Sequence, residues 1–354
     1  MISTVTVLGA GAWGTAIAKV LGEKGHNVFI WCFEKETADE INRSHTNECF
    51  LPGVPLPPSI KAGSDMEEAV SGKEYCILAV PSLYLLDIAK QLLTITSIRE
   101  GQTAIAVITK GFLETPKGPL LILDALEDYL PGFYRKSLVY IAGPSHAEEV
   151  ARHKITGLIA ASSSPKDAIR WRYLLKTSRL LVFSSLDVRG VQVAAAVKNV
   201  IAIAFGIMDV LKTKPGEAEE MFGDNTESLL LAAGLNEIQI LGMAMGATHR
   251  ETFSSISGVG DLDVTCRSVL GRNRRFGRDI VEKNILEPFK DLDDLLLRIR
   301  EIGYFPEGAA AAKYVKILAE KHNLKMPIAQ GLFQILNKEI KPLLFLRNYL
   351  GSMA

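Results

Sequence analysis

The sequence lacks most marks of a secreted, metal-binding or nucleic-acid-binding protein. Only four of its 354 residues are cysteines (Cys32, Cys49, Cys76, Cys266), and none forms a CxxC pair. This usage predicts reduced, mostly buried thiols in a cytoplasmic protein. Lys and Arg total 40 and Asp and Glu total 40, and such a balance argues against a general nucleic-acid or membrane-surface binder. No basic stretch opens the chain, so no secretion signal is expected, and no His/Cys/Asp cluster has metal-ligand spacing.

One long apolar run could be mistaken for a membrane span. Residues 191–208, VQVAAAVKNVIAIAFGIM, contain only Gln192, Lys198 and Asn199 as polar side chains. A lysine at the centre of a membrane span is costly, whereas a helix that is apolar all round fits the core of a domain. We therefore expect a buried central helix and no integral membrane segment.

The N-terminus carries a glycine motif between two apolar runs. In VTVLGAGAWGTAIAKVLGEKGHNVFIW (residues 5–31), Gly9, Gly11 and Gly14 follow a short strand and open a helix expected over residues 15–24. This arrangement is typical of dinucleotide-binding folds: glycines allow a tight turn, close approach of a pyrophosphate and close packing of the helix. A merely structural glycine turn is the alternative.

Short apolar segments alternate with helical ones up to about residue 185. Strands are expected at 74–80, 102–109, 137–143, 156–162 and 179–185, with helices at 82–94 and 118–129. This order predicts a doubly wound, Rossmann-like parallel sheet. Helical periodicity dominates afterwards, and residues 51–58 (LPGVPLPP) suggest a proline-rich surface loop. We therefore expect an α/β domain over residues 1–188 and an all-helical domain over residues 189–354.

Four constellations could carry chemistry. The first is Lys110, which follows an expected strand and could instead be a solvated loop lysine. The second is the segment Gly143–Pro144–Ser145–His146–Ala147, which also follows an expected strand and could instead be a turn with a serine helix cap. The third is Lys198 with Asn199 in the apolar helix, where a lysine must be paired or have its pKa lowered unless it snorkels to the surface. The fourth is residues 258–279, which contain Asp261 and five arginines. The arginines could form a basic patch for nucleic acid, but the chain has no net charge, which favours an arginine that binds the phosphate of a small substrate.

These motifs together resemble a known family. GAGAWGTAIA, CFLPG, LAVPS, TKG, AGPSHA, AAVKNVIAIAFGI, FGDN, GDLDVTC, GRNRRFG and PEG occur in the order and at roughly the spacing found in NAD(P)-dependent glycerol-3-phosphate dehydrogenases. The resemblance implies reversible reduction of dihydroxyacetone phosphate to sn-glycerol 3-phosphate for phospholipid synthesis. It implies a small-molecule substrate, no nucleic acid and no metal, with a homodimer as the candidate assembly.

The resemblance also implies roles for individual residues. Lys198 matches the proton donor and acceptor, with Asp261 as its partner, and Lys110 matches a residue beside both nicotinamide and substrate. The remaining implied substrate contacts are Gly143, Ser145, Asn199, Thr265, Gly271, Arg272 and Asn273. The implied cofactor contacts, besides the three glycines of the motif, are Ala12, Trp13, Phe33, Lys110, Ala147, Arg272, Phe305 and Glu307.

The cofactor preference rests on the residues that follow a strand expected at residues 28–31. Glu34 follows Phe33 there, and an acidic group near the adenosine ribose favours a free 2′-hydroxyl over a 2′-phosphate. We expect NAD(H), with some use of NADP(H) left open. A related two-domain dehydrogenase for another phosphorylated ketone or a hydroxyacid, and a non-catalytic NAD-binding protein, are the rival functions.

The chain departs from the family pattern at several positions. Val210 follows Asp209 where glycine is usual, and about seven to ten extra residues surround LKTKPGEAEEM (residues 211–221). Ala232 and Ala233 replace a threonine-arginine pair, and Asp263 adds a second carboxylate to the GDL loop. None of these changes removes a residue with an implied catalytic role.

Overall fold

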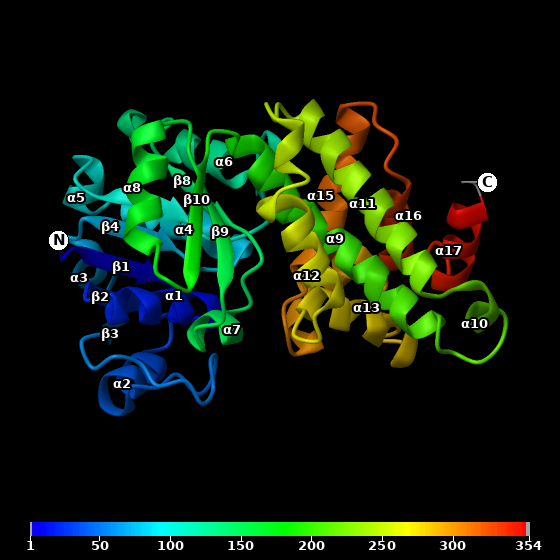
Figure 1. The fold of residues 1–354 in the computed structure, drawn as a ribbon, viewed down its shortest axis with the longest axis horizontal. Helices are drawn as coiled ribbons and strands as arrows, with labels where there is room; N and C mark the ends of the chain where they lie inside the picture. Colours follow the sequence, from blue (N-terminus) through cyan, green and yellow to red (C-terminus); the bar gives the residue numbers. More distant parts are fainter. Residues whose placement is uncertain (1, 352–354) are drawn as a thin grey trace. The chain divides into compact units, whose positions relative to one another are not determined.

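The computed structural model describes residues 2–351 of the chain, and these residues divide into two compact units at the boundary between Val188 and Arg189. The first unit is built on an eight-stranded sheet with the strand order β10-β9-β8-β5-β4-β1-β2-β3, drawn with its flanking helices in Figure 1. Its strands are β1 (Thr4–Leu8), β2 (Asn27–Trp31), β3 (Lys61–Gly63), β4 (Tyr75–Leu78), β5 (Ala104–Val107), β8 (Val139–Ala142), β9 (Thr156–Ala161) and β10 (Leu180–Ser185).

Sheet topology agrees with the predicted doubly wound class, with one correction. The strands from β3 to β8 in the sheet order pair in parallel, but β9 pairs antiparallel with β8. The expectation that residues 156–162 and 179–185 form strands parallel to the others is therefore wrong. A buried strand is apolar whichever way it runs, so its composition does not record its direction.

Helices connect these strands. They are α1 (Ala12–Glu23), α2 (Lys35–Ser44), α3 (Met66–Val70), α4 (Ser82–Leu92), α5 (Thr96–Arg99), α6 (Ile122–Tyr129), α7 (Ala147–Ala151) and α8 (Pro165–Leu175). Local signals explain several of their ends. Helix α8, for example, begins with Pro165 at its first position, and the Ser164 hydroxyl accepts a hydrogen bond from the Asp167 amide, which is a preferred start for a helix.

Two other predictions in this unit are corrected. Residues 118–121 are not helical but form β7 (Gly118–Leu121), which pairs antiparallel with β6 (Phe112–Thr115) in a separate hairpin. The proline-rich segment 51–58 is not simply a surface loop, because Leu51, Val54 and Leu56 are almost fully buried. Leu51 and Val54 pack against Ala16 of α1 and Ala147 of α7. The segment is therefore part of the apolar core next to the helix that follows the glycine motif.

The second unit is helical throughout the part that the structure describes. Its principal helices are α9 (Val188–Leu211), α10 (Glu217–Met221), α11 (Asp224–Ala244), α12 (Asp261–Arg267), α13 (Arg272–Glu282), α14 (Leu292–Leu297), α15 (Glu307–Lys321), α16 (Pro327–Leu336) and α17 (Pro342–Gly351). The extra residues around 211–221 form a loop that carries the short α10, which is labelled in Figure 1.

Helix α9 is the core of this unit. By length and composition it could cross a membrane, with a mean hydropathy of 1.8, yet its whole apolar window is buried inside the structure. Neighbouring helices approach its backbone closely: side chains at Gly206 of α9 and Gly277 of α13 would overlap with the opposite helix. The prediction of a buried central helix is confirmed.

Candidate active site

The glycine motif lies between β1 and α1, at the carboxyl end of a central strand. Gly9 has φ +121°, and a Cβ there would lie 2.9 Å from the carbonyl carbon of Ala79, which follows β4. A Cβ on Gly14 would overlap with the Gly9 carbonyl oxygen and come within 3.1 Å of the Ala79 side chain. Gly9 and Gly14 are therefore needed for the loop itself to close against the end of β4.

Gly11 is different, because a Cβ there would meet no atom within 4 Å. The space beside it is open, as close approach of a ligand to the backbone requires. Gly11 caps α1 without any side-chain hydrogen bond, and the first turn of α1 holds no acidic residue. The free N–H groups and positive end of this helix therefore suit an anion. The loop fits the pyrophosphate of a dinucleotide.

Sequence reasoning missed a residue that fixes this loop. Asn47 is fully buried, and its side-chain amide donates hydrogen bonds to the Ala10 carbonyl and to the Thr15 hydroxyl, both at 2.8 Å. Thr15 also donates to the Ala10 carbonyl, at 3.0 Å. Two side chains thus hold the carbonyl oriented within the glycine loop. An asparagine in a polar loop has no periodicity or spacing that would have singled it out.

Three further predicted residues, Lys110, Gly143 and Ser145, meet at the carboxyl ends of β5 and β8. Lys110 follows β5, and its half-buried ammonium donates to the Gly143 carbonyl at 3.1 Å. The Ser145 hydroxyl donates to the same carbonyl at 3.0 Å. Gly143 itself has φ 141°, which accommodates this turn. Parallel strands end at one edge, so residues that are 33 apart in the sequence become neighbours.

The remaining predicted cofactor contacts of this unit surround the glycine loop. Ala12 and Trp13 form the first turn of α1 and pack, with Ala147 of α7, on the small apolar cluster beneath the loop. Phe33 follows β2 and is 80% exposed, an unusual position for a phenylalanine ring. Glu34 is the N-cap residue of α2, and its carboxylate makes no capping hydrogen bond.

The second unit holds the buried lysine. Lys198 lies in α9 with only 5% of its side chain exposed, and its ammonium forms an ion pair with Asp261, of which 1% is exposed. The ammonium also donates to the Thr265 hydroxyl at 2.8 Å. The alternative of a lysine that snorkels to the surface is therefore wrong, and the contact expected between Lys198 and Asp261 is present.

The backbone before Asp261 is irregular. Residues Ile256–Gly260 form a turn of π-helix, which runs directly into α12 at Asp261. Such turns often occur at functional sites. Thr265 lies one turn later on the same face of α12 and donates to the Asp261 carbonyl at 2.6 Å. One short helix thus supplies both partners of Lys198.

A chain of amide hydrogen bonds extends this group to two other helices. Asn273, in the first turn of α13, donates to the Asn199 side chain at 3.0 Å. Its own oxygen accepts from the Gly308 amide at 2.9 Å, near the start of α15. Because Phe305 and Glu307 lie just before Gly308, these contacts bring both of them to the same region as Asn199.

Arg272 is the exposed first residue of α13, with Gly271 as its N-cap. The turn before it is held by Arg274, whose guanidinium donates to the Arg267 carbonyl at 3.0 Å and to the Asp209 carboxylate at 2.6 Å. Asp209 also accepts from Arg278, at 2.8 Å. Asp209, noted in the sequence only for its unusual neighbour, therefore helps to fix the turn that presents Arg272.

The charges near Lys198 are balanced. Burial raises the pKa of the Cys266 thiol, so this neighbour in α12 stays neutral and Asp261 remains the counter-ion. Asp263, the unexpected second carboxylate, forms an ion pair with Arg267 at 2.8 Å on the surface. Within residues 2–351, no three His, Cys, Asp or Glu side chains are grouped so as to hold a metal ion.

Two family models match the chain, and together they cover most of its length. The N-terminal model of NAD-dependent glycerol-3-phosphate dehydrogenase matches residues 4–168, and the C-terminal model of the same enzyme matches residues 187–347. The chain belongs to the NAD-dependent glycerol-3-phosphate dehydrogenase family. The resemblance inferred from the sequence motifs is confirmed.

Relatives in this family match almost end to end. The glycerol-3-phosphate dehydrogenase of Treponema denticola, named for NAD(P)+, is 55% identical over 356 residues, covering 99% of each chain. That of Bacillus subtilis is 38% identical over 332 residues, covering 94% of this chain and 89% of the relative. The crystal structure of the Coxiella burnetii glycerol-3-phosphate dehydrogenase has a TM-score of 0.83 at 30% identity and covers 99% of each chain.

More distant structures share the fold alone. A ketopantoate reductase from Ralstonia eutropha has a TM-score of 0.55 at 15% identity, and a D-mandelate dehydrogenase has a TM-score of 0.58 at 13% identity. Fold similarity at this level does not identify a substrate.

Proposed function

We propose that this protein catalyses the reversible NAD(P)H-dependent reduction of dihydroxyacetone phosphate to sn-glycerol 3-phosphate. The observation that carries the proposal is the buried Lys198 ammonium held by Asp261 and Thr265, in a chain of the glycerol-3-phosphate dehydrogenase family. The polar atoms around Lys198 can hold and deliver a proton, and the bare backbone at Gly11 suits the cofactor.

The cofactor is held by the first unit. The N–H groups at the start of α1 face the open space beside Gly11 and can bind the pyrophosphate. When bound, the nicotinamide supplies the hydride in one direction and accepts it in the other. The exposed Phe33 ring offers an apolar surface for the adenine, and Glu34 after it favours a free 2′-hydroxyl. NAD(H) is therefore the preferred cofactor, with NADP(H) as the second choice.

Lys198 is proposed as the proton donor for reduction and the acceptor for oxidation. Its Nζ delivers a proton to the carbonyl oxygen of the substrate while the carbonyl carbon is reduced. Asp261 keeps the ammonium paired and oriented, and the Thr265 hydroxyl, which accepts from Lys198 and donates to the Asp261 carbonyl, fixes its position. A positive charge already in place also stabilises the developing alkoxide without reorganisation.

Substrate recognition is proposed to rest on a phosphate grip. Arg267, Arg274, Arg275 and Arg278 each form ion pairs with carboxylates of the chain. Arg272 differs from them, because its guanidinium has no hydrogen-bond or ion-pair partner among the described residues. This pattern supports a guanidinium reserved for one phosphate rather than a basic patch for nucleic acid. In the second unit we propose Asn199, Gly271 and Asn273 as further substrate contacts. In the first unit we propose Lys110, Gly143 and Ser145.

The cellular role follows from the product. sn-Glycerol 3-phosphate is the backbone of phospholipids, so we propose that the enzyme supplies phospholipid synthesis in the cytoplasm. Three buried, reduced cysteines support a reducing compartment. A homodimer is the proposed assembly, since the edge strand β10 exposes Leu181 and Phe183 and offers unpaired backbone groups.

Steady-state oxidation of NADH, followed by absorbance, tests the reaction. The full-length protein should oxidise NADH with dihydroxyacetone phosphate and much more slowly with dihydroxyacetone, ketopantoate or benzoylformate, which lack the phosphate. The last two represent the substrate types of the more distant structures. Faster turnover with either of them than with dihydroxyacetone phosphate would replace the proposed substrate, and no turnover with any ketone would favour a non-catalytic NAD-binding protein.

A further inference from the structure

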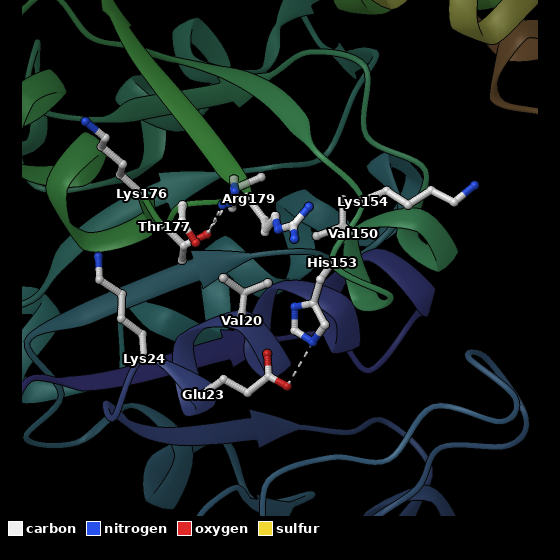
Figure 2. Close-up of a pocket in the computed structure, with 11 residues that line it drawn as sticks. Val20, Glu23, Lys24, Val150, His153, Lys154, Lys176, Thr177 and Arg179 are labelled. Carbon is white, nitrogen blue, oxygen red and sulfur yellow. Dashed lines mark hydrogen bonds and ion pairs between the residues drawn. The ribbon is translucent and has the colours of Figure 1, made fainter.

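The first unit has a pocket that the proposed reaction does not use. It has a volume of about 360 Å³ and lies at the C-terminal end of α1, where residues from α1, the end of α7 and the turn between α8 and β10 meet (Figure 2). The glycine loop lies at the other end of the same 12-residue helix, which at 1.5 Å per residue is about 18 Å long. The pocket is therefore separate from the proposed cofactor contacts.

The walls of this pocket are preformed. Val20, Val150 and Leu180 are almost fully buried and form its apolar base. The turn that enters β10 is organised by Thr177, whose hydroxyl accepts from the Arg179 and Leu180 amides at 3.1 and 2.8 Å. The Thr177 amide in turn donates to the Leu180 carbonyl at 3.0 Å. A ligand would therefore meet a turn that is already ordered, at little entropic cost.

The lining is strongly basic. It includes Lys24, His153, Lys154, Lys176 and Arg179, with Glu23 as the carboxylate among the lining residues. Glu23 is itself neutralised, because it pairs with the buried Lys19 and lies 3.4 Å from His153. The local excess of positive charge is therefore not cancelled within the pocket, and an anion would be attracted to it.

Arg179 is the group best placed to hold such an anion. Other basic side chains have partners: Lys24 donates to the Leu174 carbonyl at 2.8 Å, and Lys154 pairs with Glu149 at 3.1 Å. Within the described residues, the Arg179 guanidinium has no hydrogen-bond or ion-pair partner. Figure 2 shows it turned toward His153 above Val20, whereas the ammonium groups of Lys154 and Lys176 point outward.

We propose that this pocket binds a small phosphate-bearing anion, with the Arg179 guanidinium as its two-point donor and the His153 ring beside it. A planar guanidinium matches two phosphate oxygens at once, and the volume lies within the range of small-molecule sites. The apolar base formed by Val20, Val150 and Leu180 would contact the uncharged part of such a molecule. The proposal is independent of the reaction catalysed elsewhere in the chain.

Histidine NMR of the full-length protein tests the proposal locally. The chain has six histidines; with ¹³C-labelled imidazoles, the His153 signal is assigned by its loss in His153→Gln. Inorganic phosphate is titrated at constant pH and ionic strength, with chloride as the exchanged anion. We expect the His153 signal to shift to saturation. The His146 signal, from the residue after Ser145, reports phosphate bound at the proposed substrate contacts instead.

Two variants decide which side chain is responsible. Arg179→Gln should weaken the phosphate affinity read at His153 by about tenfold or more, as the loss of a charge-assisted pair predicts. Arg135→Gln, an equal charge change at another exposed arginine of the same unit, should leave the affinity unchanged. A His153 signal that does not move, that moves linearly without saturating, or that saturates equally in Arg179→Gln would overturn the proposal. The other five histidine signals verify that each variant is folded.

Discussion

Glu237 in α11 gives the helical unit a stability that depends on pH. Its carboxylate is 3% exposed and accepts hydrogen bonds from the Ile328 amide at 2.6 Å and the Ala329 amide at 3.1 Å. These amides belong to the first turn of α16, so one side chain of α11 satisfies the open end of another helix. Burial raises the pKa of Glu237 from 4.5 to about 7, although the two amide bonds oppose that rise.

The size of the effect follows from this shift. The unfolded chain loses the Glu237 proton near pH 4.5, whereas the folded chain keeps it to about pH 7. Protonation therefore favours the folded state; this contribution is complete below pH 4.5 and is lost as the pH rises to 7. A shift from 4.5 to about 7 corresponds to about 3 kcal/mol at 1.36 kcal/mol per pKa unit.

Glu237→Gln removes the titration and keeps a side chain of similar shape. We expect the free energy of unfolding of the wild-type protein, relative to that of the variant, to fall by about 3 kcal/mol between pH 4.5 and 7. Urea unfolding followed by circular dichroism at several pH values measures this difference. The matched control is Glu320→Gln, an exposed glutamate of α15 that pairs with Lys316, where the difference should stay nearly constant. A pH-independent difference for Glu237→Gln would refute the reasoning.

Three further predictions concern the proposed site. Arg272→Lys should raise the KM for dihydroxyacetone phosphate at least about tenfold, since lysine cannot make the two-point contact, while the KM for NADH changes little. Substrate kinetics equal to those of the wild-type protein would show that Arg272 does not bind the substrate phosphate. Glu34→Gln should raise kcat/KM with NADPH on the order of tenfold, because a carboxylate no longer repels the 2′-phosphate, and an unchanged NADPH/NADH ratio would remove Glu34 from cofactor selection. Asp209→Asn should lower the free energy of unfolding by about 2 kcal/mol, because Arg274 would keep its buried charge without a carboxylate, and urea unfolding that shows no change would contradict this.

The sequence predicted the parts of the fold that depend on local pattern. Buried strands are continuous apolar runs between glycines and prolines, and α9 is apolar all round, so both could be recognised from composition. The sequence predicts helix at residues 118–121, where the structure has a hairpin strand, because the apolar residues there run directly into α6. Periodicity alone does not separate strand from helix over so short a stretch. The direction of β9 depends on contacts across the sheet, which no local pattern contains.

In the candidate site, too, local sequence pattern predicts some features, whereas contacts between residues distant in sequence determine others. Lys198 could be singled out because a lysine is costly inside an apolar helix, and the resemblance named Asp261 as its partner. Asn47 and Asp209 could not be found, because each acts through partners that are distant in sequence and only folding brings together. Asn47 holds the Ala10 carbonyl across 37 residues, and Asp209 reaches Arg274 across 65.

The mechanism rests on Lys198, and the pair that it forms with Asp261 determines how it should be tested. Lys198→Met alone would leave a carboxylate that is 1% exposed without its counter-ion, at a cost of about 3–5 kcal/mol in stability. A loss of activity could then reflect a damaged fold. Lys198→Met combined with Asp261→Asn removes both charges. Asp261→Asn alone keeps the proposed proton donor but leaves its ammonium without a counter-ion, so urea unfolding of both variants is measured beside their activity.

The most direct measurement is single-turnover oxidation of bound NADH by saturating dihydroxyacetone phosphate in the wild-type protein and these variants. We predict that the double variant binds NADH normally, as judged by its fluorescence, but reacts at least about a hundredfold more slowly, the scale of general acid catalysis. Asp261→Asn alone should lose less. A double variant that oxidises NADH at a rate close to that of the wild-type protein would contradict the assignment of Lys198 as the proton donor.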